Sequence, residues 1–442
     1  MTYQHVNNPI RDSIHADAGY LAELADWLWR NPETGFKEIK TTQHLIRELE
    51  TIGLSVTTWE NMTGFMAELD TGRPGPCICL MSELDSVVCW DHPDHDPETG
   101  AVHACGHHVQ SVAVIGAVRA LLSSGVLPQL CGKIRIIGVP AEECLQLDWR
   151  LQEIAAGRLR YLSGKAELIH RGVFDDIDVV ISIHASCTPH RSIRLMGTNN
   201  GFLAKSVTFQ GRAAHAAMSP DTGINALYMA NTAMTALNGI RETFRDSDTV
   251  RIHPIITKGG SIVNSIPEEV CLECLCRAAN MDTVLEAGEK FDRAMGAGAY
   301  GFGGKAVIRT QPGYFPQIVI PALWDVALDA AETCVADPSE IEHGEYTHET
   351  GSSDLGDLQS VLPAIQCYTG FATGSLHAAN WHVVSEEAFT LAAEFLASFS
   401  IKLLENDAAA VKRIRETYTP YFATSDAYRE FCDRLFSTKV LP

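Results

Sequence analysis

A β-branched apolar run that ends in two acids decides the fold: KIRIIGVPAEE, residues 133–143. Its three isoleucines and one valine predict a buried strand, Lys133–Val139, which Pro140 follows. Glu142 and Glu143 then stand side by side, and two adjacent carboxylates repel each other unless a positive charge lies nearby. A solvated surface pair is the alternative for the acids taken alone. The segment therefore predicts a buried strand whose carboxyl end carries a metal-binding or catalytic acid pair.

Two other apolar runs also end in candidate functional residues. Cys77–Met81 precedes Asp85, and Val179–Ile183 precedes His184. A helical pattern, residues 109–122, lies between the strands. Strands that alternate with helices predict an α/β fold with a central, mostly parallel sheet covered by helices. Ligands of such sheets gather beyond the carboxyl ends of the strands, which is where these residues fall.

A different pattern begins near Gly197. The predicted strands are 205–210, 251–257, 269–278 and 305–310, and the predicted helices are 225–244 and 283–295. This β-α-β-β-α-β order is typical of a ferredoxin-like α+β domain. A chain of 442 residues also favours at least two domains. We expect residues 1–197 and 313–442 to form a catalytic metal-binding domain, with the ferredoxin-like domain, residues 198–312, inserted between them.

The composition argues against several classes of function. A net charge of −21 opposes binding to nucleic acids and to anionic membranes. We find no run of about 18 apolar residues that predicts a membrane span, and the residues Met1–His5 do not resemble the start of a signal peptide. The thirteen cysteines are an odd number scattered through apolar segments. They fit reduced thiols, so we expect a cytoplasmic protein.

Five short clusters carry candidate metal ligands and catalytic groups. They are residues 103–108, 140–143, 183–185, 211–215 and 376–378. Divalent transition metals accept imidazole, thiolate and carboxylate donors together. Cys105 is the candidate bridge between two ions, because metals depress the pKa of a thiol that binds them. Each residue alone also has a structural explanation, such as a buried cysteine or a core histidine.

The two adjacent acids, Glu142 and Glu143, are expected to have different roles. Glu143 is assigned to a metal, and Glu142 is left to take a proton from a water molecule and pass it to a leaving nitrogen. Asp85 is expected to orient a ligand imidazole, with a cap of the strand-end turn as its alternative. Among the late histidines, His377 is preferred to its neighbour His382 as a ligand.

Taken together, these residues resemble the two-metal metallopeptidase family of aminoacylases and glutamate carboxypeptidases. They are most similar to its amidohydrolase branch, which contains N-acyl amino acid, auxin-conjugate and p-aminobenzoyl-glutamate hydrolases. The likeness runs along most of the chain. The stretches that carry it are WRNPETGFKE (29–38), LDSV (84–87), HACGH (103–107), PAEE (140–143), GRAAHAA (211–217), GGSIVNSIP (259–267) and GSSDLGD (351–357).

The resemblance implies a role for each matching residue. The implied metal ligands are Cys105, at the bridging position, His107, Glu143, His184 and His377. Glu142 matches the general base, and Asp85 matches the aspartate that orients a ligand histidine. The implied cofactors are two divalent transition-metal ions, with zinc or manganese expected and cobalt or nickel also suited to these donors.

The resemblance also implies a role for the inserted domain. It matches a lid and dimerisation domain, so we expect a homodimer built through it. His215 and Asn264 match residues that meet the substrate. In relatives, the histidine that matches His215 reaches the active site of the neighbouring subunit and stabilises the oxyanion.

The expected function is hydrolysis of a C–N bond in a small molecule that bears a carboxylate. The favoured substrate is the amide of an N-acyl or N-aroyl amino acid, similar to aminobenzoyl-glutamate, attacked by metal-activated water. An alternative is release of ammonia from an activated aminoarene such as a nitroanthranilate. A lesser alternative is a non-catalytic metal-binding or interaction protein, against which the acid Glu142 argues, because a closed structural site needs no such group.

Three departures from the family pattern leave the metal and the substrate open. His108 stands where relatives commonly carry aspartate. Gln110 lies where a second histidine often follows. Ala378 replaces the more usual serine or threonine after the last ligand.

Overall fold

The computed structural model describes residues 8–442, so Met1–His5 lie outside the described part. The chain divides into two compact units. Unit 1 comprises residues up to 197, 319–347 and 358–425, and unit 2 comprises 198–318, 348–357 and 426–442. Within the described residues, we find no helix long and apolar enough to cross a membrane. All thirteen cysteines are free thiols.

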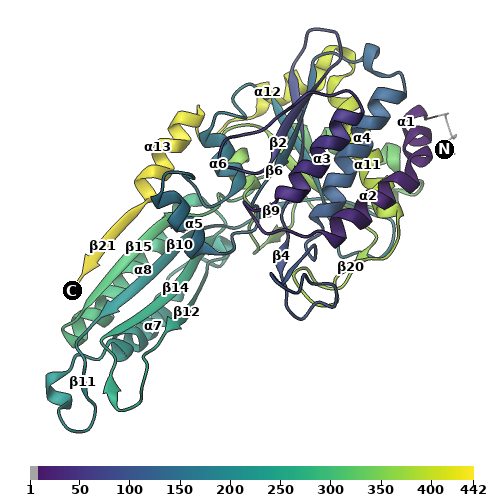
Figure 1. The fold of residues 1–442 in the computed structure, drawn as a ribbon. Helices are drawn as coiled ribbons and strands as arrows, with labels where there is room; N and C mark the ends of the chain where they lie inside the picture. Colours follow the sequence, from purple (N-terminus) through teal and green to yellow (C-terminus); the bar gives the residue numbers. More distant parts are fainter. Residues whose placement is uncertain (1–7) are drawn as a thin grey trace. The chain divides into compact units, whose positions relative to one another are not determined.

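Unit 1 is built on an eight-stranded sheet whose central strands are parallel (Figure 1). In spatial order the strands are β1 (Val56–Thr57), β2 (Phe65–Asp70), β6 (Lys133–Val139), β3 (Cys77–Glu83), β7 (Val179–Ala185), β18 (Ala364–Thr369), β8 (Ile193–Leu195) and β16 (Ile341–His343). The strands β3, β6, β7 and β18 run parallel, and every residue of β3 and β7 is buried. Burial on both faces explains why these strands are continuous apolar runs.

Helices α3, α4, α9 and α11 contact this sheet. The helices of unit 1 are α1 (Pro9–Ala16), α2 (Ala18–Arg30), α3 (Ile39–Thr51), α4 (His107–Ser123), α5 (Leu147–Ala155), α6 (Gly164–His170), α9 (Pro321–Cys334), α11 (Glu387–Leu404) and α12 (Ala409–Thr417). Helices α4 and α11 pack on each other and on β3 and β7, and their apolar side chains form much of the core. The bounds of β6 agree with the predicted strand, and β7 extends past His184 to Ala185.

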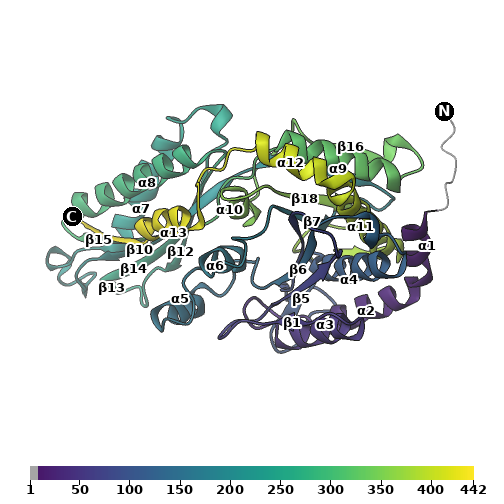
Figure 2. The same cartoon turned by 90° about the horizontal axis from the view of Figure 1, so that it is seen from above.

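Unit 2 has the predicted ferredoxin-like order. Its elements are β10 (Gly201–Gln210), α7 (Ala226–Arg241), β12 (Arg251–Lys258), β14 (Glu269–Ala278), α8 (Met281–Phe302) and β15 (Lys305–Pro312). The sheet order β12-β14-β10-β15 is antiparallel throughout, and α7 and α8 lie side by side on it (Figure 2). The alternating burial of β14 gives this sheet one apolar face, on which the helices pack. The α/β fold class with an α+β insert is thereby confirmed.

The division of the chain differs from the predicted boundaries at the C-terminal side. Residues 426–442 belong to unit 2, because β21 (Ser437–Leu441) pairs with β15 as a fifth strand after α13 (Ser425–Leu435). Residues 348–357 also belong to unit 2, since β17 (His348–Glu349) pairs with β9 (Thr198–Asn199). The expected second catalytic segment, 313–442, therefore contains three stretches of unit 2, which are residues 313–318, 348–357 and 426–442.

Candidate metal centre

The candidate ligands of unit 1 come together at the carboxyl edge of the parallel strands. His184 comes from β7, and Glu143 follows β6. Cys105 precedes α4, and His107 is the first residue of that helix. His377 lies in the loop between β19 (Ala372–Thr373) and β20 (His382–Val383).

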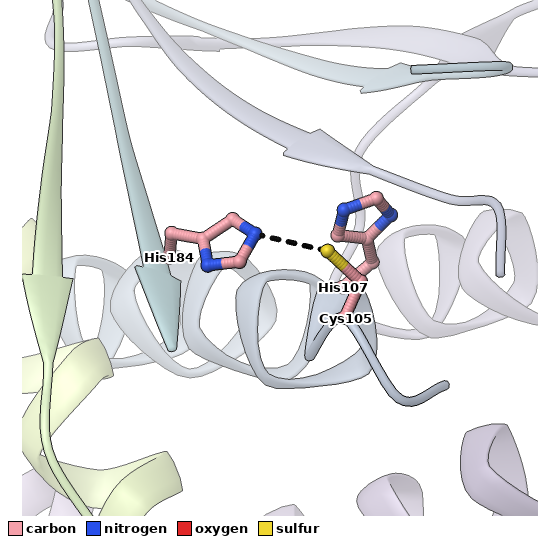
Figure 3. A group of neighbouring side chains, drawn as sticks. All are labelled: Cys105, His107 and His184. Carbon is pink, nitrogen blue, oxygen red and sulfur yellow. Dashed lines mark hydrogen bonds between the residues drawn. The ribbon is translucent and has the colours of Figure 1, made fainter. Parts of the chain in front are cut away.

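Two groups of donor atoms share the thiol of Cys105. One group is Cys105, His107 and His184, and the other is Cys105, Glu143 and His377, with the donor atoms of each group within 4.8 Å of one another. The sulfur lies 3.5 Å from Nε2 of His184 and 3.3 Å from Nε2 of His377. Figure 3 shows His184 on its strand facing Cys105, with the ring of His107 beside the sulfur. This arrangement and its mixed N, O and S donors fit two neighbouring divalent transition-metal ions.

Backbone contacts orient the imidazoles. Nδ1 of His184 lies 3.0 Å from the carbonyl oxygen of Ala185, and Nδ1 of His107 lies 2.9 Å from that of Asp85. A carbonyl oxygen accepts only, so each Nδ1 carries a proton, and in the neutral ring Nε2 then has the lone pair that can bind a metal. Such contacts are the usual support of metal-binding histidines.

Asp85 connects the acid pair to His107. Its Oδ1 accepts the backbone N–H of Glu142 at 3.2 Å and lies 3.3 Å from Nδ1 of His107, while its Oδ2 accepts the N–H of Glu143 at 2.9 Å. The Asp85 side chain is fully buried. One carboxylate therefore fixes the loop after β6 and contacts a candidate ligand, as its predicted orienting role requires.

The electrostatics of the centre reflect burial. Burial, together with the nearby Glu143 carboxylate, raises the pKa of the Cys105 thiol. Burial also lowers the pKa of His184 to about 4, which keeps its imidazole neutral. For Glu143, the hydrogen bond and charge of His377 outweigh burial and lower the pKa. A divalent cation would act against the first effect, because metals deprotonate the thiols that coordinate them.

Glu142 borders the two ligand groups without belonging to either. Its carboxylate forms a third donor group with Glu83 and His107, again within 4.8 Å. His382, the weaker ligand candidate, belongs to none of the three groups found among residues 8–442. His108 turns into an aromatic cluster, with its ring centroid 5.2 Å from that of Trp29.

The two predicted substrate residues of unit 2 lie together. His215 is in β11 (Ala214–His215), which pairs with β13 (Ser265–Ile266), and Asn264 accepts the N–H of Ala216 at 3.0 Å through its carbonyl oxygen. Nδ1 of His215 accepts backbone N–H groups from Ala217 and Met218, at 3.2 and 3.0 Å. Nε2 of this exposed ring therefore carries the proton and is a hydrogen-bond donor.

Sequence reasoning missed several buried groups beside the centre. Glu38 accepts the N–H of Ala141 at 2.8 Å, and Arg150 donates to the carbonyl oxygen of Glu143 at 2.5 Å. Lys165 pairs with Glu83. Glu83 carried a signal, since it ends a buried strand two residues before Asp85, and Glu38 ends the stretch 29–38 that carries the family resemblance. A lone lysine or arginine in a helix carries none.

Known proteins resemble this chain over most of its length. Residues 198–301 match the M20 peptidase dimerisation domain. The chain is 30% identical over 293 residues to one of the p-aminobenzoyl-glutamate hydrolase subunits of Escherichia coli (strain K12), a match that covers 64% of the chain but only 55% of that relative. It is 26% identical over 426 residues to N-acetyl-L-cysteine deacetylase from Bacillus subtilis (strain 168), covering 92% of the chain and 93% of the relative.

A solved structure shares the fold. It is a protein of Bacillus subtilis described as a dinuclear metal-binding peptidase of the M20 family, with a TM-score of 0.67 at 20% identity over 88% of this chain and 99% of that one. The family resemblance predicted from the motifs is confirmed by these matches. These findings support the likeness of the chain to the M20 family of aminoacylase-like metallopeptidases.

Proposed function

We propose that the protein is a two-metal amidohydrolase that cleaves the amide bond of an N-acyl or N-aroyl amino acid. The observation that carries the proposal is the pair of donor groups that share Cys105. The names of the relatives support the substrate class, because one acts on p-aminobenzoyl-glutamate and another on N-acetyl-L-cysteine.

Cys105, His107 and His184 would hold one cation, and Cys105, Glu143 and His377 the other. Bound there, zinc, manganese or a similar ion would supply Lewis-acid activation of the water and the amide carbonyl. Glu142 then takes the proton of the attacking water and delivers it to the leaving nitrogen. Asp85 contacts both the backbone of Glu142 and the ring of His107, and so fixes the positions of the proposed base and of one proposed ligand relative to each other.

Unit 2 would complete the site. The dimerisation-domain match supports a homodimer through this unit. His215, with Nε2 as a donor, is suited to stabilise the oxyanion of the reaction in the partner's site, and Asn264 to contact the substrate. The free thiols support a cytoplasmic location.

The test uses protein purified without chelator and analysed for metal content. Aroyl amino acids, acyl amino acids and aminoarenes are assayed for release of carboxylate and of ammonia. We expect amide cleavage by the wild type, and a loss of about 10²–10⁴-fold in turnover in Glu142→Gln with metal content unchanged. Glu50→Gln, an exposed residue at the end of α3, is the matched control.

The outcomes separate the alternatives. Ammonia release without amide cleavage would assign the chain to aminoarene hydrolysis. Metal-loaded protein that releases neither product from any compound would support the non-catalytic alternative. An active Glu142→Gln variant would refute the assigned base.

A further inference from the structure

A buried ion pair lies beside the two donor groups that share Cys105, and neither partner belongs to those two groups. Oε1 of Glu83 lies 2.6 Å from Nζ of Lys165, and the two side chains are 1% and 0% exposed. Glu83 ends β3, and Lys165 lies in the first turn of α6. Lysine and glutamate are almost never so deeply buried unless they are paired. The contact is therefore specific, and it fixes one oxygen of Glu83.

Gln110 fixes the other oxygen. Its Nε2 donates to Oε2 of Glu83 at 2.6 Å, and its Oε1 accepts the backbone N–H of Glu83 at 3.1 Å. The carboxylate is held from both sides, by α4 and by α6, in one orientation. This contact also gives a function to the glutamine that stands where relatives often carry a second histidine.

The held carboxylate lies within reach of a candidate cation position. Its Oε2 is 3.3 Å from Nε2 of His107, the atom that would bind the cation. Donor atoms of Glu83, His107 and Glu142 lie within 4.8 Å of one another. A carboxylate released from its partners here would become a further metal ligand. Catalytic sites, in contrast to structural ones, keep one coordination position open for water or substrate.

We propose that Lys165 is a positioning residue that withholds Glu83 from the cation of the His107–His184 group and so keeps a coordination position open. In this proposal Lys165 acts through Glu83, and Gln110 holds the other oxygen of the same carboxylate. The importance of the open position rests on the proposed hydrolase function. The effect on metal binding does not, and it is measured separately.

The first test is Lys165→Met. Its metal affinity, measured by competition with a chelator, should equal or exceed that of the wild type, because the released Glu83 adds a ligand. Turnover should fall about tenfold or more, the usual scale for groups behind a metal site. The visible absorption of cobalt-loaded protein should weaken as the coordination number rises. If Lys165 has only a structural role, Lys165→Met should lose metal affinity and turnover together. That result would overturn the proposal.

The double variant Glu83→Gln/Lys165→Met keeps the proposal testable if the single variant does not fold. It removes both charges, which proteins generally tolerate better than removal of one partner. Because Glu83 is not a ligand under this proposal, the double variant should bind metal within about threefold of the wild type, well inside the usual effect of losing a supporting group. A loss of more than about tenfold would identify Glu83 as a ligand and refute the withholding role.

A matched control exists in the same unit. Lys133 pairs with Glu68 at 2.7 Å, with side chains 45% and 34% exposed, so Lys133→Met should leave affinity and turnover unchanged. If the wild type proves inactive on every substrate, the proposed function fails. The affinity and cobalt spectra of the variants then still decide the role of Lys165.

Discussion

The sulfur of Cys105 lies 3.3 Å from Nε2 of His377, although 272 residues separate them in the chain. A backbone hydrogen bond supports this contact, because the N–H of His377 donates to the carbonyl oxygen of Ala104 at 3.0 Å. His377 adopts a φ of +62°, which is uncommon for a residue other than glycine. The late loop is thus tied to the cysteine loop, and the second ligand group depends on that tie.

Replacing the thiol of Cys105 should reduce the number of metal ions that the chain binds. Cys105→Ser removes the thiol proposed to bridge the two ions, and a serine hydroxyl is a poor substitute because it stays protonated near neutral pH. We expect metal content to fall from two ions per chain to one or fewer, measured by elemental analysis after dialysis. Cys105→Asp should retain more metal, since a carboxylate can bridge. Cys367→Ser, a buried cysteine of β18, is the control and should keep both ions.

Asp85→Asn should lower metal affinity or turnover without unfolding the chain. Asparagine has one oxygen where aspartate presents two, so its NH₂ group would face the N–H of Glu142 or Glu143. We expect a loss of about 10–100-fold in metal affinity or turnover. Asp70→Asn is the control, because Asp70 also accepts a backbone N–H after a strand but is exposed. Equal effects of the two substitutions would contradict the orienting role of Asp85.

The sequence was sufficient to predict the central strands and to place candidate ligands after them. Buried parallel strands are continuous apolar runs and half-buried strands alternate, so β6 and β14 could be bounded to the residue. Ligands of parallel sheets gather beyond the carboxyl ends of the strands, and this rule predicted that Glu143 and His184 lie at the same edge of the sheet. The roles assigned to these residues stay predictions until they are tested.

Other features could not be predicted because partners distant in the chain determine them. β21 has an irregular burial pattern, and its place is set by pairing with β15. In the sequence Lys165 resembles any helical lysine, and its burial follows from Glu83, 82 residues earlier. Periodicity within a segment contains no information on either contact.

Glu38 should make stability depend on pH. Burial, and next the nearby charge of Asp85, raise its pKa in the folded chain to about 8, from an ordinary value of 4.5. A raised folded pKa means that this contribution to stability is complete below about pH 4.5 and is lost as the pH rises through about 8. Glu38→Gln mimics the protonated acid, so its free energy of unfolding relative to the wild type should increase from pH 5 to pH 8.

Denaturant unfolding of chelator-treated protein at several pH values measures this difference. Glu50→Gln should show no such trend, because Glu50 is exposed. If the difference in free energy of unfolding between the wild type and Glu38→Gln stays constant from pH 5 to pH 8, the pKa of Glu38 is not raised in the folded chain.

Gly106 should prove necessary for the geometry of the centre, because it joins Cys105 to His107 with a φ of +86°. A Cβ at this position would lie 2.7 Å from the Cβ of Ala185 and 3.0 Å from the ring of Trp381. Gly125 also has a positive φ, +74°, but nothing within 4 Å of its Cβ position. Both alanine substitutions therefore incur the backbone penalty of about 1–2 kcal/mol, and only Gly106→Ala also incurs the steric conflict.

We expect Gly106→Ala to lower the melting temperature more than Gly125→Ala and to reduce metal affinity, while Gly125→Ala leaves affinity unchanged. Chelator competition and thermal unfolding of both variants measure this, and equal behaviour of the two would mean that the cysteine loop tolerates displacement.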